Sequence, residues 1–168
     1  MTAVRVRRQT PGMCKHPLFE TMKKCCTLPQ FMKKGVYKNC KMDNRSTDKK
    51  DEAAANERAC KGECVLRNQT LLTSTGTVDI SKLTEQYLAA SDSNWKPIVQ
   101  AAITNCTSEL AKVNSTAPPA GGCNPANGRL VWCINRYSLL NCPNSPCKTS
   151  DIEALRSCDP FRLLKKIG

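Results

Sequence analysis

Twelve cysteines in a chain of 168 residues constrain this sequence more than any other feature. The number is even, and reducing cytosol does not usually keep so many thiols, so we predict a secreted protein with up to six disulfides and no free thiol. Each bridge is expected to stabilise the fold by about 2–4 kcal/mol, because it restricts the unfolded chain. The length suits one domain with a buried core.

Composition and motifs argue against several classes of protein. No apolar run approaches the roughly 20 residues that a membrane span needs. The chain has only 1 His, His16, and no Cys-x2-Cys pair, so we expect no metal site and no cofactor. Without a second histidine or a glycine-rich phosphate loop, we also predict that the chain is not an enzyme and has no catalytic residues.

The charge of the chain is strongly positive. There are 26 Lys and Arg against 14 Asp and Glu, which gives a formal net charge of +12. The basic residues are spread along the chain, which favours solvated surfaces; the alternative is a cationic disulfide-rich protein that binds anionic membranes or polysaccharides, or a receptor. Nucleic acid is not expected as a partner, because no aromatic residues alternate with the basic ones.

The spacing of apolar residues predicts an all-α fold of about seven short helices. The clearest helix begins at Trp95 and continues to Leu110 with apolar residues at helical spacing. Asp79 is predicted to cap one helix, and Ser150 and Glu153 to form a capping box for the last. The predicted helices cover residues 17–25, 30–41, 53–68, 80–90, 95–110, 127–141 and 151–158.

The two ends of the chain are expected to differ from its middle. Residues 1–13 are predicted to be a flexible basic tail, and residues 14–168 a single domain with an extended C-terminal segment. The first ten residues lack the apolar core of a signal peptide, so we expect that a signal has been removed and that Met1 is an expression start. Possible glycosylation sites at Asn44, Asn68 and Asn114 agree with secretion.

The positions of four cysteines limit how they can pair. Cys60 and Cys64 lie four residues apart on a predicted helix, so their side chains point the same way. This is a poor geometry for a bond between them, and each is expected to join a different element. The adjacent Cys25 and Cys26 are likewise expected to anchor two elements. Spacing alone does not choose among the many possible pairings.

The cysteine spacing resembles that of insect odorant-binding proteins. That family has a Cys-x3-Cys helix, a fourth cysteine about forty residues later and a Cys-x8-Cys pair near the end. Here Cys60 and Cys64 form the first motif, 41 residues separate Cys64 from Cys106, and eight separate Cys133 from Cys142. The resemblance covers most of the chain.

Further features are similar to the Plus-C subclass of this family. They are the wide gap after Cys106, Pro143 directly after Cys142 and the additional cysteines. The resemblance implies three bridges, Cys26–Cys64, Cys60–Cys133 and Cys106–Cys142; in the first, Cys25 or Cys40 could replace Cys26. The cysteines left over, with partners unassigned, are Cys14, Cys25, Cys40, Cys123, Cys147 and Cys158.

The resemblance also implies a function. We expect a helical bundle, held open by disulfides around an apolar cavity, that carries small odorant-like or lipid-like molecules. Secretion into sensillar lymph, a role in olfaction, and a monomeric or homodimeric state follow from the same resemblance. Trp95 and Tyr137 are favoured as ligand contacts because each joins an apolar ring to a hydrogen-bond donor. The full predicted lining is Leu71, Leu72, Leu83, Leu88, Trp95, Ile98, Val99, Ile103, Ile134 and Tyr137.

Overall fold

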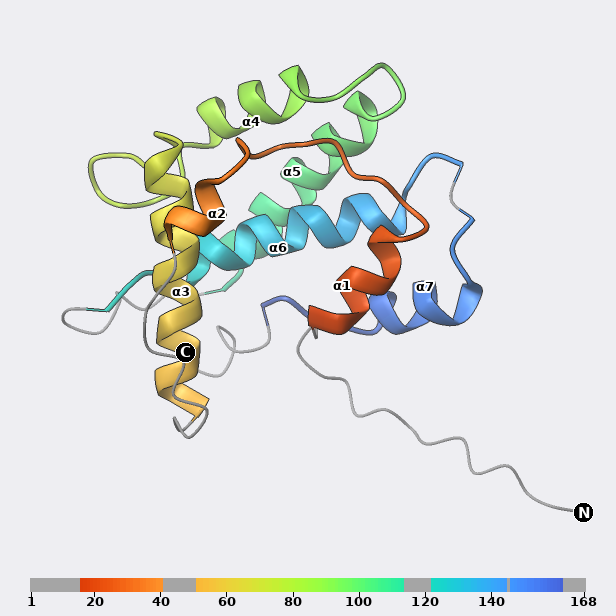
Figure 1. The fold of residues 1–168 in the computed structure, drawn as a ribbon. Coiled ribbons are helices and arrows are strands. Elements are labelled where there is room, and N and C mark those ends of the chain that lie inside the picture. The colour runs from red at the N-terminus through yellow and green to blue at the C-terminus, as the bar shows by residue number, and fades with distance from the viewer. Residues whose placement is uncertain (1–15, 41–50, 114–121, 145, 162–168) are drawn as a thin grey trace, which may run out of the picture.

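The computed structural model describes residues 16–40, 51–113, 122–144 and 146–161 (Figure 1). Within these ranges the chain is all-α, which confirms the predicted fold class, and it has one isolated bridge between Leu72 and Val78. No described helix is both long and apolar enough to cross a membrane. The helices are α1 (His16–Lys23), α2 (Val36–Asn39), α3 (Asp51–Asn68), α4 (Ile80–Ala89), α5 (Lys96–Ala111), α6 (Pro125–Leu140) and α7 (Thr149–Arg156).

Most of the predicted helices are found close to their expected positions. The exception is the helix predicted over residues 30–41, of which only α2 forms. Gly35 precedes α2 with a φ of 86°, a left-handed conformation that a continuous right-handed helix does not contain. The predicted tail 1–13 and the last residues, 162–168, lie outside the described residues.

The two predicted caps have different outcomes. Asp79 caps α4 as expected, because its Oδ1 accepts a hydrogen bond of 3.1 Å from the backbone N–H of Lys82. The predicted capping box is wrong. The helix begins one residue before Ser150, so the serine lies inside the first turn, and Glu153 instead forms an ion pair of 2.8 Å with Arg156.

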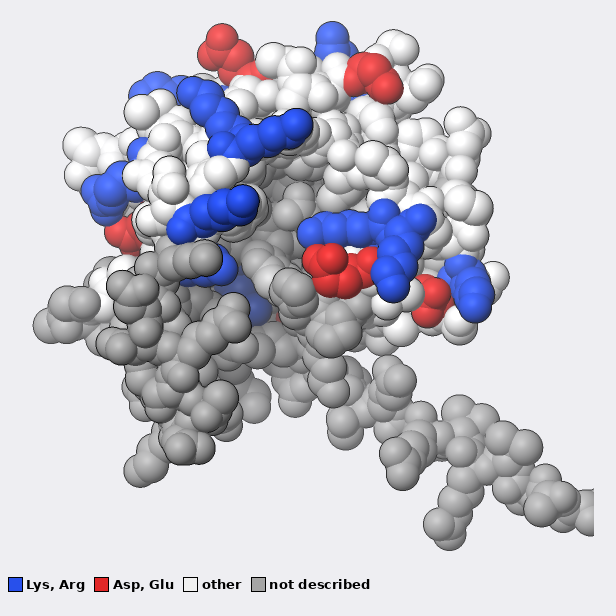
Figure 2. Space-filling view, in the orientation of Figure 1, with Lys and Arg blue, Asp and Glu red and all other residues white. Residues whose placement is uncertain are grey.

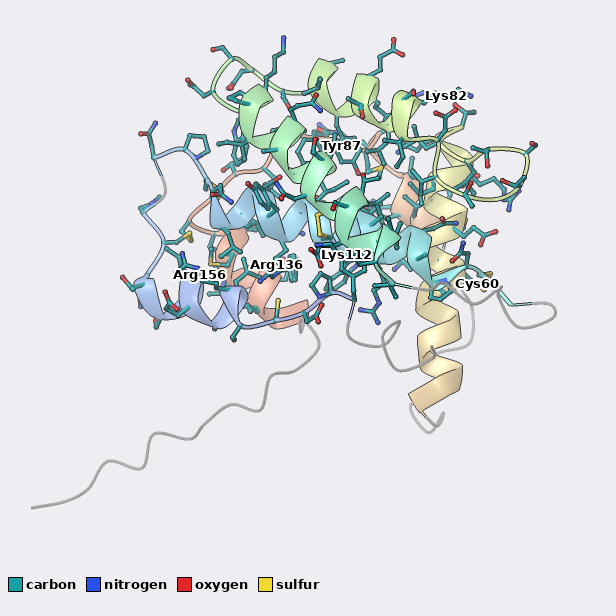
Figure 3. The ribbon with its side chains drawn as sticks, turned by 180° about the vertical axis from the view of Figure 1, so that it is seen from behind. Cys60, Lys82, Tyr87, Lys112, Arg136 and Arg156 are labelled. Atoms are coloured by element: carbon teal, nitrogen blue, oxygen red, sulfur yellow. A yellow bond between two sulfur atoms is a disulfide. The ribbon has the colours of Figure 1, made fainter. Side chains whose placement is uncertain are left out.

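Helix α6 lies at the centre of the fold. It packs most extensively against α3 and α5, and it also contacts α1 and α7 (Figure 1). Arg136 of α6 fastens the end of α7, since its guanidinium donates hydrogen bonds to the carbonyl oxygens of Leu155 at 3.0 Å and Arg156 at 2.6 Å (Figure 3). These carbonyls belong to the last turn of α7, where a cation also interacts favourably with the helix dipole.

The contact between α3 and α6 depends on two facing glycines. A Cβ atom placed on Gly62 would lie 3.0 Å from the Cα of Gly128, whereas a Cβ on Gly128 would lie 3.9 Å from the Cα of Gly62. A glycine within a helix costs up to about 1 kcal/mol relative to alanine. Gly62 therefore occupies a position where a side chain would push the two helices apart.

We expect the same substitution at these two glycines to have opposite effects. Gly62→Ala should lower the free energy of unfolding by about 1 kcal/mol, because the clash with the backbone of α6 exceeds the gain in helix propensity. Gly128→Ala should raise it by up to about 1 kcal/mol. Urea denaturation followed by circular dichroism measures both variants, and equal effects would argue against a close contact at Gly62.

The structure corrects the disulfide pairing that the family resemblance implies. The pairs Cys26–Cys64, Cys60–Cys133 and Cys106–Cys142 are all wrong, although the alternative partner Cys40 does bond to Cys64. The reason lies in the packing of α6, which contacts both α5 and α1, so that Cys133 of α6 meets Cys106 of α5 and Cys142, just after α6, meets Cys26, just after α1. The described bridges are Cys25–Cys147, Cys26–Cys142, Cys40–Cys64, Cys60–Cys123 and Cys106–Cys133.

Other expectations about the cysteines are mostly confirmed. Cys60 and Cys64 bond to different parts of the chain, so α3 is fastened both to an earlier and to a later segment. Cys25 and Cys26 also bond separately, but both reach the single segment 142–147 rather than two elements. No described cysteine is free, and Cys14 lies outside the described residues.

Candidate functional site

The ten residues predicted to contact a ligand all belong to one core cluster. Six are buried, and the other four are partly buried and pack against the rest. The structure therefore brings together side chains from α4, α5, α6 and the segment before α4, while their contact with a ligand stays a prediction. The buried residues are Leu71, Leu83, Trp95, Val99, Ile103 and Ile134, and the partly buried ones are Leu72, Leu88, Ile98 and Tyr137.

A pocket of about 530 Å³ lies beside this core, between the start of α4, the end of α5 and the start of α6. The buried Leu130, Ala126 and Val113 are among its lining residues. The pocket is partly open to solvent rather than enclosed, and its volume falls within the roughly 300–1,000 Å³ of typical small-molecule sites. None of the ten predicted residues lines it. The lining residues are Thr77, Val78, Ile80, Thr107, Leu110, Ala111, Val113, Asn124, Ala126, Asn127 and Leu130.

Hydrogen bonds position the walls of this pocket. Asn127 is 2% exposed, and its side-chain amide donates a hydrogen bond of 2.8 Å to the carbonyl oxygen of Gly76. This bond joins α6 to the turn before α4, where Gly76 has a φ of 77° that suits glycine. On the other side, Glu63 of α3 accepts a hydrogen bond of 3.0 Å from the N–H of Asn124, at the start of α6.

Two disulfides hold the same region. Cys106 precedes the pocket residue Thr107 and bonds to Cys133, which joins α5 to α6. Cys123 precedes Asn124 and bonds to Cys60 of α3. One bridge therefore joins α6 to α5, and the other joins the segment just before α6 to α3. These cross-links limit how far the pocket can collapse when it is empty.

The comparisons with known proteins identify the family. Residues 29–158 match the family model described as AgamOBP47-like. The chain belongs to this family of insect odorant-binding proteins. It is similar to general odorant-binding protein 68 of Anopheles gambiae, with 26% identity over 152 residues, which cover 83% of this chain and 66% of that relative.

A second relative has the same degree of similarity. Odorant-binding protein 47 of Anopheles gambiae is 26% identical over 142 residues, which cover 76% of this chain and 62% of the relative. The chain therefore spans just under two thirds of the length of each of these two curated odorant-binding proteins. No solved structure matches the chain.

Membership of the family bears on the question of catalysis. Odorant-binding proteins are carriers without enzymatic activity, so the family supports the prediction that this chain is not an enzyme. In the described ranges, no group of three or more His, Cys, Asp or Glu residues could hold a metal ion.

One buried tyrosine of this odorant-binding protein was not among the predicted site residues. Tyr87 of α4 (Figure 3) is fully buried. Its ring stacks on Phe31 with centroids 4.4 Å apart. Its hydroxyl has no hydrogen-bond partner among the described residues. Burial raises the pKa of the hydroxyl, and the nearby Tyr37 adds to this, so Tyr87 stays neutral. The criterion that favoured Trp95, an apolar ring with a polar tip, applies equally to Tyr87.

Tyr87→Phe is expected to stabilise the ligand-free protein. The variant removes a buried hydroxyl without a partner, which should raise the free energy of unfolding by about 1 kcal/mol at neutral pH. Because the folded pKa is raised, the wild type keeps its stability below a pH of about 10 and loses it above, when the unfolded tyrosine ionises. Above that pH, the difference in the free energy of unfolding between the variant and the wild type should therefore grow by about 1.4 kcal/mol per pH unit.

Urea denaturation at neutral pH and at a pH of about 11 tests this expectation. Tyr137→Phe is the control, because Tyr137 is only partly buried and should change stability by less than about 0.5 kcal/mol. A variant at Tyr87 that is less stable than the wild type would show that its hydroxyl makes a bond in the folded protein.

Proposed function

We propose that this chain is a secreted carrier that binds a small hydrophobic molecule in the pocket between α4, α5 and α6. The observation that carries the proposal is the pocket of about 530 Å³ beside an apolar core. Family membership supports the class of ligand, and the many disulfides support secretion. We also propose that the chain belongs to the Plus-C subclass and acts in odorant transport in sensillar lymph, as a monomer or a homodimer.

The chemistry of the pocket walls favours an apolar ligand. Most lining side chains are aliphatic. The hydroxyl of Thr107 donates a hydrogen bond of 2.7 Å to the carbonyl oxygen of Ile103, and the amide of Asn127 donates to Gly76. The Thr107 hydroxyl thus uses its one donor within the fold and keeps acceptor capacity, and the Asn127 amide has an oxygen acceptor besides the N–H that it donates to Gly76. An apolar molecule with one hydroxyl group, such as a terpene alcohol or a fatty alcohol, suits this arrangement.

Three of the predicted contact residues lie next to the pocket along the helices. Leu83 is three residues after Ile80, Ile103 is four before Thr107, and Ile134 is four after Leu130. Residues at these spacings lie on the same face of a helix, one turn apart. We therefore propose that Leu83, Ile103 and Ile134 form the deeper wall met by a ligand longer than the pocket itself.

Displacement of a fluorescent apolar probe tests the proposal. N-phenyl-1-naphthylamine should bind with a dissociation constant of about 1 µM or tighter, and long-chain alcohols should displace it. The affinity should stay the same in about 1 M salt, because the binding is not electrostatic. Reduced and unfolded protein serves as the control. The absence of binding, or binding that salt abolishes, would contradict a carrier of apolar molecules.

A further inference from the structure

A positively charged segment crosses one face of the molecule. The segment that follows α1, residues 24–40, includes α2, and we call it the lysine segment. Figure 2 shows basic side chains gathered on the face that this segment crosses. Its path is fixed by disulfides at Cys25, Cys26 and Cys40, although α2 is its only helix.

The lysine segment has an apolar inner side and a basic outer side. Phe31 and Val36 are 6% and 9% exposed, and the ring of Phe31 stacks on Tyr87 of α4. The segment contains no Asp or Glu. Because its inner side chains and its disulfides hold it against the core, its outer side chains are presented from a fixed backbone. The exposed ones include Lys24, Lys33, Lys34, Tyr37 and Lys38.

The four lysines lack the carboxylate partner that five described cations outside the segment have. Lys23, Lys82 and Lys112 each form an ion pair with a carboxylate three residues away. Arg67 and Arg156 form similar pairs. In the part of the chain that the structure describes, Lys24, Lys33, Lys34 and Lys38 form no ion pair. Their positive charge is therefore available to an external anion.

An exposed aromatic side chain lies among these lysines. Tyr37 is 49% exposed and is the single exposed large hydrophobic residue of the described chain. Tyrosine prefers the boundary between the apolar interior of a bilayer and its headgroups, and lysines near an anionic bilayer are attracted to it. We propose that the lysine segment docks on an anionic phospholipid bilayer, with its four lysines against the headgroups and Tyr37 at the interface.

The aromatic ring favours a bilayer over a sulfated polysaccharide. A polysaccharide offers anionic groups to the lysines but no apolar layer for the ring of Tyr37. A bilayer offers both. This docking surface is separate from the proposed ligand pocket, since no residue of the lysine segment lines it. The two proposals can therefore fail independently, and binding of the naphthylamine probe reports on the pocket alone.

Sedimentation with phospholipid vesicles tests the proposal. The protein should bind vesicles with about 30% phosphatidylserine at an ionic strength of about 0.1 M, and should not bind pure phosphatidylcholine. The variant K24Q/K33Q/K34Q/K38Q should bind roughly several hundred-fold more weakly, since each lysine contributes roughly five-fold near an anionic surface. Circular dichroism and probe binding should match the wild type, because all four side chains are exposed.

A second set of lysines gives a matched control. K61Q/K82Q/K96Q/K112Q removes the same charge from exposed lysines elsewhere and should weaken vesicle binding less than about ten-fold. Equal losses in both variants would show attraction by net charge alone and would overturn the docking surface. If the four substitutions of the lysine segment unfold the protein, K33Q/K34Q should still weaken binding more than K82Q/K112Q does.

Tyr37 separates the bilayer from a polysaccharide. Tyr37→Ser should weaken vesicle binding several-fold, and Tyr37→Trp should preserve it, because tryptophan also favours the interface. Binding to immobilised heparin should not depend on this side chain. Tight binding to heparin without binding to the anionic vesicles, or equal vesicle binding by both variants at Tyr37, would overturn the proposal.

Discussion

Removing both disulfides that join Cys25 and Cys26 to the segment 142–147 is expected to lower the free energy of unfolding by about 5 kcal/mol or more. The two bridges close nearly the same loop, with sequence separations of 122 and 116 residues. A cross-link that closes so long a loop restricts the unfolded chain strongly. Without both of them, α1 loses its covalent link to the end of α6.

Removing either bridge alone should cost much less, about 2 kcal/mol. The remaining bridge still closes the long loop, and only a short loop of about six residues is released. The effect of the double removal should therefore exceed the sum of the two single removals. Cys26→Ala/Cys142→Ala should be the costlier single removal, because Cys26 is buried and Cys25 is only partly buried.

Guanidinium denaturation at 25 °C of the two single-bridge variants and the variant without both bridges gives the three free energies. Cys40→Ala/Cys64→Ala is the control, since its bridge closes a shorter loop of 24 residues, which is nested within both long loops, and leaves either long bridge in place. Its loss should be about 3 kcal/mol, whether or not the bridges at Cys25 and Cys26 are present. Additive losses for the two long bridges would contradict the redundancy argued above.

The helices of the fold could be predicted from the sequence because local rules decide them. Apolar spacing gave α5, and the carboxylate of Asp79 gave the start of α4. The prediction failed over residues 30–41, where bridges and the left-handed Gly35 decide the path of the chain. The family resemblance gave the correct family but not the pairing. Which cysteine meets which depends on how α1, α5 and α6 pack, and sequence spacing does not contain that information.

The candidate site was harder to predict than the fold. Apolar stripes identify side chains that leave water, such as Leu83 and Ile134, and most of these fill a core. The pocket is lined at the ends of helices, where aliphatic residues such as Ile80 and Leu130 are joined by polar ones such as Thr107 and Asn127. The shape of the pocket depends on how α4, α5 and α6 pack against one another. Periodicity along one of them therefore cannot report it.

Filling the pocket from α5 is expected to weaken ligand binding strongly. Thr107 and Ala111 both line the pocket and lie one turn apart on α5. In the variant T107W/A111W two indole rings would occupy the space proposed for the ligand. We expect the affinity for N-phenyl-1-naphthylamine to fall by on the order of a hundred-fold, which corresponds to about 3 kcal/mol. The fold should be retained, because the rings enter space that no side chain occupies.

The same helix offers a closely matched control. Thr104 and Ser108 are exposed, have the same spacing and do not line the pocket. Thr104 also resembles Thr107 in its hydrogen bond, since each hydroxyl donates to the carbonyl oxygen four residues earlier. T104W/S108W should therefore bind the probe as the wild type does. If both variants keep the wild-type affinity, the ligand binds elsewhere, and the predicted residues deeper in the core, such as Ile103 and Val99, become the next to substitute.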